Sequence, residues 1–130
     1  MKNSSNIKQI ELLDIQRIAS LCYIVTTMVS IFLTTHREDV LKGKDGSLTN
    51  LQAKKINVGN HFTILILACV FLYVNHVNLN LAREQGKDTH LLTLQYTSAV
   101  LAVIGAILVL YVVIVEPVQN ETGAFENPEL

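Results

Sequence analysis

Charged side chains are missing from three long stretches of this sequence. Residues 18–36, 56–82 and 89–115 contain no Lys, Arg, Asp or Glu. A helix that crosses about 30 Å of hydrocarbon needs roughly 20 apolar residues, and each stretch is long enough to supply them. The sequence therefore predicts an all-α integral membrane protein with three transmembrane helices in an up-down-up arrangement. The first stretch is longer than the apolar part of a signal peptide and no Ala-x-Ala site follows it, so we expect a retained helix.

Tryptophan is absent, and there are only two cysteines. The missing tryptophan removes one of the usual anchors at the membrane surface, which leaves the four tyrosines to form any aromatic belt: Tyr23, Tyr73, Tyr96 and Tyr111. Cys22 and Cys69 fall at similar depth in an antiparallel hairpin. Thiols inside a bilayer are usually inert apolar fillers, so we expect no disulfide.

The residues needed for catalysis or metal binding are also missing. No Asp or Glu lies inside a predicted span, which excludes the usual carboxylate relay of ion-coupled transport. No nucleophile-elbow, metalloprotease or phosphate-loop motif occurs. The histidines are scattered and none pair four residues apart: His36, His61, His76 and His90. We therefore expect no catalytic, cofactor or metal site and no enzyme, and the nearly balanced charge gives no reason to expect nucleic acid as a partner.

Glycines and capping residues mark where the three helices end. Gly43 and Gly86 suit the position just after a helix, with Ser47 and Asp88 as N-caps of the next one. Pro117 ends the third helix because proline disfavours helical backbone in the residue before it. The prediction is a single membrane domain, residues 1–117, with tight glycine-containing turns and three helices: 6–42, 48–85 and 89–116.

The first two predicted helices are each longer than the bilayer is thick. Residues 36–56 are therefore expected to form a helical hairpin tip in water, rich in Lys and Arg. This tip is either a plain solvated cap or a docking surface for another protein. Residues 118–130 are acidic and contain no Lys or Arg, which predicts a disordered tail.

Small and weakly polar residues recur every four positions in two of the spans. Lipid solvates leucine as well as a neighbouring helix does, so membrane helices associate through close backbone approach and interhelical hydrogen bonds. The stripes predict that the first and third helices meet, within one chain or between copies. They comprise Cys22, Thr26, Ser30 and Thr34 in the first span, and Ser98, Ala102, Gly105 and Ala106 in the third.

Polar residues from all three spans fall at one predicted depth. They are Arg17, Ser20, Asn75, His76, Asn78, Gln95 and Ser98. One hypothesis is a polar chamber or ion path with His76 and Arg17 as its ionisable groups, because such groups inside a membrane usually have a function. The other is that Arg17 reaches the headgroups while the amides hydrogen-bond the helices together.

Membrane orientation is left open, because five Lys and Arg lie on each side of the three spans. The expected location is a bacterial cytoplasmic membrane. The expected partners are the lipid bilayer and either further copies of the chain or other membrane subunits.

Three classes of function fit this architecture. The first, which we expect, is a non-enzymatic accessory or regulatory subunit of a membrane complex that acts through helix–helix contacts. The second is a homo-oligomeric pore or permeabilising protein, which resembles phage holins in size and number of spans. Holins usually carry a basic C-terminal tail, whereas this tail is acidic. The third, a membrane enzyme or transporter, is disfavoured by the missing carboxylates.

Overall fold

The computed structural model describes residues 4–44 and 48–117, which form three α-helices joined by two turns. The helices are α1 (Ser4–Leu41), α2 (Asn50–Glu84) and α3 (His90–Val115). Each is long and apolar enough to cross a membrane. The predicted fold class is confirmed, and every helix end lies within two residues of its predicted position. The predicted tail, 118–130, lies outside the described residues.

Two glycines end α1 and α2, as predicted. Gly43 and Gly86 have φ values of 78° and 70°, in the left-handed region that only glycine enters without strain. The amide N–H of each glycine donates to a carbonyl three residues earlier, and the next N–H donates to one five residues earlier, at distances of 2.8 to 3.1 Å. This paired arrangement is the Schellman motif, and it reverses the chain in a short turn.

The start of α2 differs from the prediction. The helix begins at Asn50 and its N-cap is Thr49, whose hydroxyl accepts from the Gln52 backbone N–H at 3.1 Å. The Gln52 side chain accepts from the Thr49 N–H at 3.0 Å, which completes a capping box. Ser47, the predicted cap, lies outside the described residues. The N-cap of α3 is Thr89, whose side chain makes no capping bond, and not Asp88 as predicted. Asp88 lies one residue earlier, and its Oδ1 accepts from the His90 N–H at 3.0 Å.

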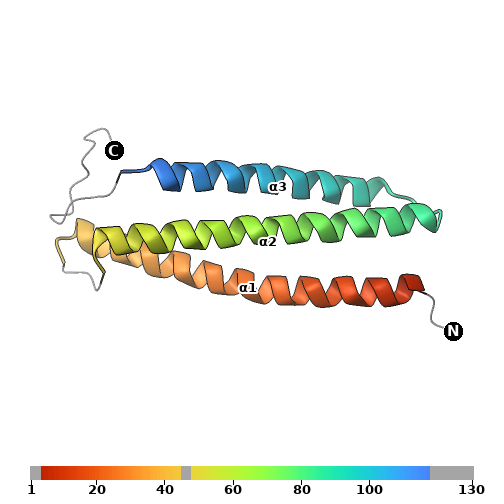
Figure 1. Cartoon of the computed structure of the whole chain (residues 1–130), viewed down its shortest axis with the longest axis horizontal. Helices are drawn as coiled ribbons and strands as arrows, with labels where there is room; N and C mark the ends of the chain where they lie inside the picture. Colours follow the sequence, from red (N-terminus) through yellow and green to blue (C-terminus); the bar gives the residue numbers. More distant parts are fainter. Residues whose placement is uncertain (1–3, 45–47, 118–130) are drawn as a thin grey trace.

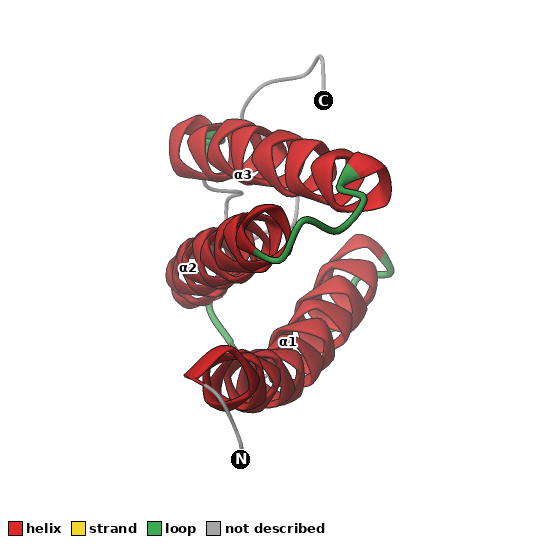
Figure 2. Cartoon of the chain, turned by 90° about the vertical axis from the view of Figure 1, so that its right-hand side faces the viewer, coloured by secondary structure: helices red, strands yellow, loops and turns green. Residues whose placement is uncertain are grey.

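The three helices form an open row, with α2 between the other two (Figures 1 and 2). Helix α2 packs on α1 and on α3, and no Cα atom of α1 comes within 8 Å of one in α3. The predicted contact between the first and third helices is therefore wrong within the described chain. The physical reason is that Thr26 and Ser30 of α1 face α2, where Asn60 donates hydrogen bonds to the Thr26 carbonyl and to Ser30 Oγ.

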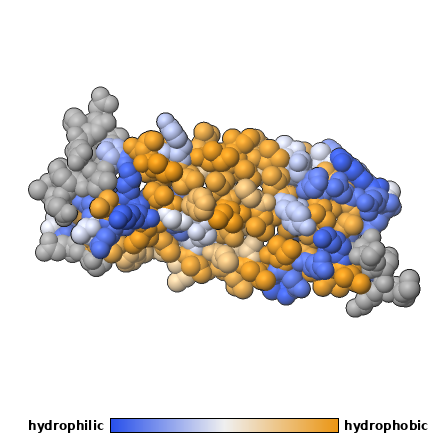
Figure 3. Space-filling view, in the orientation of Figure 1, coloured by the Kyte–Doolittle hydropathy of each residue, from blue (hydrophilic) through white to orange (hydrophobic). Residues whose placement is uncertain are grey.

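On the face drawn in Figure 3, the middle of the molecule's length is mainly hydrophobic, and hydrophilic residues gather toward the two ends. Large apolar side chains are exposed along all three helices, for example Met28 at 64%, Leu101 at 63% and Tyr111 at 64%. Only two large side chains in the described chain are fully buried, Leu12 and Val74. An exposed apolar band of this extent is stable in lipid and unfavourable in water, so the surface is that of an integral membrane protein.

Candidate functional site

A groove opens on the row of helices near the middle of the span. It has a volume of about 460 Å³, and all three helices line it. Its lining residues are Gln16 and Tyr23 of α1, Ala68, Phe71 and Asn75 of α2, and Gln95, Ser98, Ala99 and Ala102 of α3. We call it the three-helix groove.

The depth of the groove follows from the geometry of α3. That helix has 26 residues, so its midpoint lies near Ala102. A hydrocarbon layer of about 30 Å covers roughly 20 helical residues, so a layer centred on α3 alone would include Ser98 and Ala102. Gln95 then lies inside, near one boundary. Glu116, the first charged residue after α3, lies beyond the opposite boundary. Gln16 lies at the level of Ser98 and Ala102 and adjoins the exposed ion pair of Arg17 and Asp14, which puts this part of the groove toward the membrane surface.

Several polar groups in the groove lack a partner within the described chain. Gln16, Gln95 and Ser98 make no side-chain hydrogen bond to any described residue. Asn75 Nδ2 donates to the Phe71 carbonyl of its own helix at 2.8 Å, and so does not tie α2 to a neighbour. Polar groups in contact with lipid tails are costly unless they are hydrogen-bonded, so the groove is unfavourable when it faces lipid alone.

The predicted polar layer is only partly gathered in the groove. Asn75, Gln95 and Ser98 line it, whereas Arg17, Ser20, His76 and Asn78 do not. Arg17 is paired with Asp14 at 3.3 Å, and its side chain is 74% exposed. His76 Nε2 lies 3.2 Å from Asn80 Nδ2, and the His76 ring packs against Tyr96 with centroids 5.9 Å apart. The two ionisable residues of the hypothetical chamber thus lie outside the groove.

The small-residue stripes have different surroundings from those predicted. Thr26 is buried and Ser30 is half-buried against α2, while Cys22 and Thr34 are exposed. In α3, Ser98 and Ala102 are exposed in the groove, and Gly105 and Ala106 are half-buried. Both cysteines are free thiols.

Asn60 joins α1 to α2 by hydrogen bonds, and the sequence patterns considered above did not predict this role. Its side chain is 7% exposed, and Nδ2 donates to the Thr26 carbonyl at 3.2 Å and to Ser30 Oγ at 2.9 Å. An interhelical hydrogen bond inside a membrane contributes about 0.6–2 kcal/mol. The sequence could have predicted this contact, because folding the chain near residue 45 brings position 60 opposite position 30.

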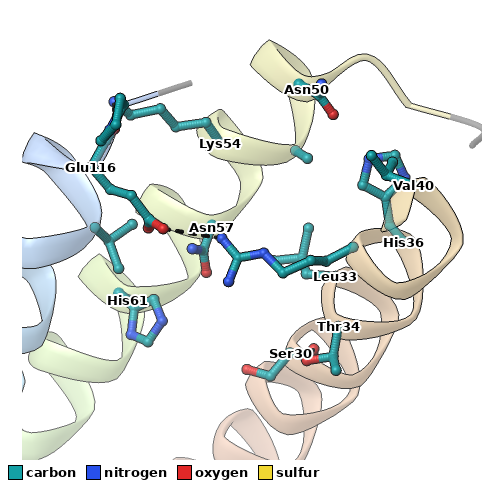
Figure 4. Close-up of a pocket in the computed structure, with 14 residues that line it drawn as sticks. Ser30, Leu33, Thr34, His36, Val40, Asn50, Lys54, Asn57, His61 and Glu116 are labelled. Atoms are coloured by element: carbon teal, nitrogen blue, oxygen red, sulfur yellow. Dashed lines mark hydrogen bonds and ion pairs between the residues drawn. The ribbon is translucent and has the colours of Figure 1, made fainter. Parts of the chain in front are cut away.

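A second cavity lies at the hairpin end of the molecule and has a volume of about 410 Å³ (Figure 4). Its polar lining includes His36 and Arg37 of α1, Lys54, Asn57 and His61 of α2, and Glu116 after α3. Apolar lining comes from Leu33, Val40, Ala53 and Val113. We call it the hairpin-end cavity.

Glu116 joins the three segments that surround this cavity. The Arg37 guanidinium lies 3.1 Å from the Glu116 carboxylate, across 79 positions of sequence. The Lys54 ammonium donates to the Glu116 backbone carbonyl at 2.7 Å. Since Arg37 belongs to α1 and Glu116 directly follows α3, these contacts bridge the ends of two helices that have no Cα atoms within 8 Å of each other.

His36 is the least expected feature of the hairpin-end cavity. The sequence predicts it on a solvated tip, but only 7% of its surface is exposed. Neither ring nitrogen has a hydrogen-bond partner among the described residues. A buried imidazole without partners is costly, and such groups commonly mark the place of a ligand, ion or water.

Neither a metal site in the described part of the chain nor a similar protein of known function points to what this protein does. Among the described residues, no group of three His, Cys, Asp or Glu is placed to hold a metal ion. Comparison with protein-family models, curated proteins and solved structures finds nothing that matches the chain. Function must therefore be argued from the groove and the cavity.

Proposed function

We propose that this protein is a non-enzymatic accessory subunit of a membrane complex, and that the three-helix groove binds a transmembrane helix of a partner protein. The observation that carries the proposal is the set of unpaired polar side chains in the groove. Gln16, Gln95 and Ser98 have no hydrogen-bond partner among the described residues, and lipid tails against the groove would supply none. A helix with polar groups of its own supplies those partners.

The shape of the groove also favours a helix. Ala68, Ala99 and Ala102 are among its lining residues, and an incoming backbone can approach closely over them. Close approach over small residues is how membrane helices gain packing energy in the absence of a hydrophobic driving force. The groove opens on a row of three helices in which α2 packs on both of the others and α1 and α3 do not pack on each other.

Catalysis and ion conduction find less support in the groove. It contains no carboxylate, lysine, arginine or histidine. The alternative function, a homo-oligomeric pore, uses the same groove with a second copy of this chain as the occupant. The two proposals therefore differ in the identity of the bound helix.

Substituting Ala102 by phenylalanine tests the proposal. Ala102 is exposed in the groove, so the larger ring fills the partner's space while α1, α2 and α3 stay packed. We expect Ala102→Phe to lower partner retention at least about tenfold, the factor that corresponds to the loss of one or two close helix contacts. The matched control is Leu101→Phe, on the neighbouring exposed position outside the groove.

The measurement is native mass spectrometry of the full chain extracted gently from its own membranes, with helix content checked by circular dichroism. A second protein at fixed stoichiometry, retained by wild type and Leu101→Phe and lost from Ala102→Phe, supports the accessory subunit. A homo-oligomer with the same dependence moves the assignment to the pore. Equal retention by both variants contradicts a role for the groove.

A further inference from the structure

We infer that the hairpin-end cavity is a binding site for the phosphate headgroup of an anionic phospholipid. The site is separate from the three-helix groove and does not depend on the function proposed for it. Lys54 and Asn57 of α2 and Arg37 of α1 bring hydrogen-bond donors to the cavity, and His36 forms part of its wall. Phosphate oxygens are acceptors that match such donors.

The charge of the cavity favours an anion. Arg37 and Lys54 contribute two positive charges and Glu116 contributes one negative charge. Lys54 donates to a backbone carbonyl, and no carboxylate among the described residues neutralises its charge. The cavity also includes Asn50, the first residue of α2, where the positive end of the helix dipole adds to the field.

Two donors in the cavity have no partner in the described chain. Both His36 nitrogens are buried and unbonded, and the Asn57 amide makes no hydrogen bond to a described residue. Figure 4 shows Asn57 between Lys54 on one side and the α1 side chains on the other. A phosphate bound near Lys54 would accept a hydrogen bond from the Asn57 amide, which has no partner among the described residues.

The position of the cavity points to a lipid as the source of the phosphate. It lies at the end of the apolar band, where the surface turns hydrophilic (Figure 3). Leu33 and Val113 line the cavity together with the cations, so apolar and charged walls adjoin. A phospholipid has this division in one molecule, and basic pockets between helices at the membrane surface bind anionic headgroups.

Neutralising Lys54 tests the inference against a matched control. Lys54→Gln removes the unneutralised charge, while Lys55→Gln makes the same change one residue along, outside the cavity. Full-length protein in detergent is titrated with phosphatidylglycerol, and bound lipid is counted by native mass spectrometry. We expect Lys54→Gln to weaken binding about tenfold, as for the loss of one charged hydrogen bond, and Lys55→Gln to weaken it less than about twofold.

Two parallel titrations identify the ligand. Phosphatidylcholine, which carries a compensating cation, and inorganic phosphate, which has no acyl chains, are each expected to bind at least about tenfold more weakly than phosphatidylglycerol. Equal losses in Lys54→Gln and Lys55→Gln would overturn the site, because they would indicate general attraction to a basic surface. Equal binding of inorganic phosphate would overturn the lipid as its ligand, and equal binding of phosphatidylcholine would overturn the preference for an anionic one.

Glu116→Gln gives a test in the opposite direction. The Glu116 carboxylate occupies Arg37 and would compete with a phosphate for it. Its removal is expected to tighten phosphatidylglycerol binding by about two- to fivefold, the factor that an exposed ion pair contributes. If Glu116 serves only to hold the helix ends together, the variant will lose thermal stability and bind lipid no more tightly, and this result would count against the inference.

Discussion

Replacing Asn60 by aspartate will lower the stability of the protein by roughly 3 kcal/mol. The substitution keeps the shape of the side chain but exchanges its amide donor for a carboxylate oxygen. That oxygen would face the Thr26 carbonyl, an acceptor, at the position where the amide now donates at 3.2 Å. The position is 7% exposed, so the new charge would be buried without a described cation as a partner.

The control for this prediction is Asn57→Asp, the same change one turn earlier in α2. Asn57 lines the hairpin-end cavity with Lys54 and Arg37, so a carboxylate there gains neighbouring cations. We expect its effect on stability to stay within about 1 kcal/mol. Reversible unfolding in mixed detergent micelles, followed by circular dichroism, measures both variants. Equal losses would show that Asn60 does not clamp α1 to α2.

The helices of this protein could be predicted from sequence because lipid imposes a simple rule. A span without charges long enough to cross the membrane becomes a helix, since every backbone group must be bonded within it. Gly43 and Gly86 set the two C-termini because their left-handed φ values are strained in other residues. The start of α2 was missed because Ser47 and Thr49 are both good caps. Gln52, three residues after Thr49, is the feature that distinguishes them.

The order of the helices could not be predicted from the stripes of small residues. Such residues permit close approach to any neighbour, so they do not specify which one. Thr26 and Ser30 were assigned to a contact with α3, but they bond to Asn60 of α2. A long polar side chain within a span, such as Asn60, is a more specific signal because it must find a partner.

The candidate sites depend on which face of each helix a residue occupies. The hairpin register predicts how deep each residue lies along the helices. It placed Asn75, Gln95 and Ser98 at one level, and all three line the same groove. The register did not show which of two adjacent residues faces the groove. Gln16 lines the groove, whereas Arg17 is exposed and paired with Asp14. In the same way, the register placed His36 on the tip but did not show that its ring is buried.

Replacing Leu12 by alanine is expected to cost about 2–5 kcal/mol, the range for truncating a fully buried leucine. Leu12 is 1% exposed and lies near the start of α1. Antiparallel register places it level with Leu79 of α2, which is 4% exposed. The alanine would leave a cavity there, because the surrounding helices can relax only in part.

The adjacent Leu13 provides the control, because 57% of its surface is exposed and Leu13→Ala opens no cavity. We expect it to cost less than about 1 kcal/mol in the same unfolding measurement. The comparison also bears on the three-helix groove. Gln16 and Tyr23, the α1 residues of the groove, lie in sequence between Leu12 and the contacts with Asn60. If the Leu12 contact and the Asn60 contacts together hold the α1 side of the groove in place, Leu12→Ala will weaken partner retention as well as stability. Leu13→Ala will change neither. A loss of stability with full partner retention would show that the groove forms without the Leu12 contact.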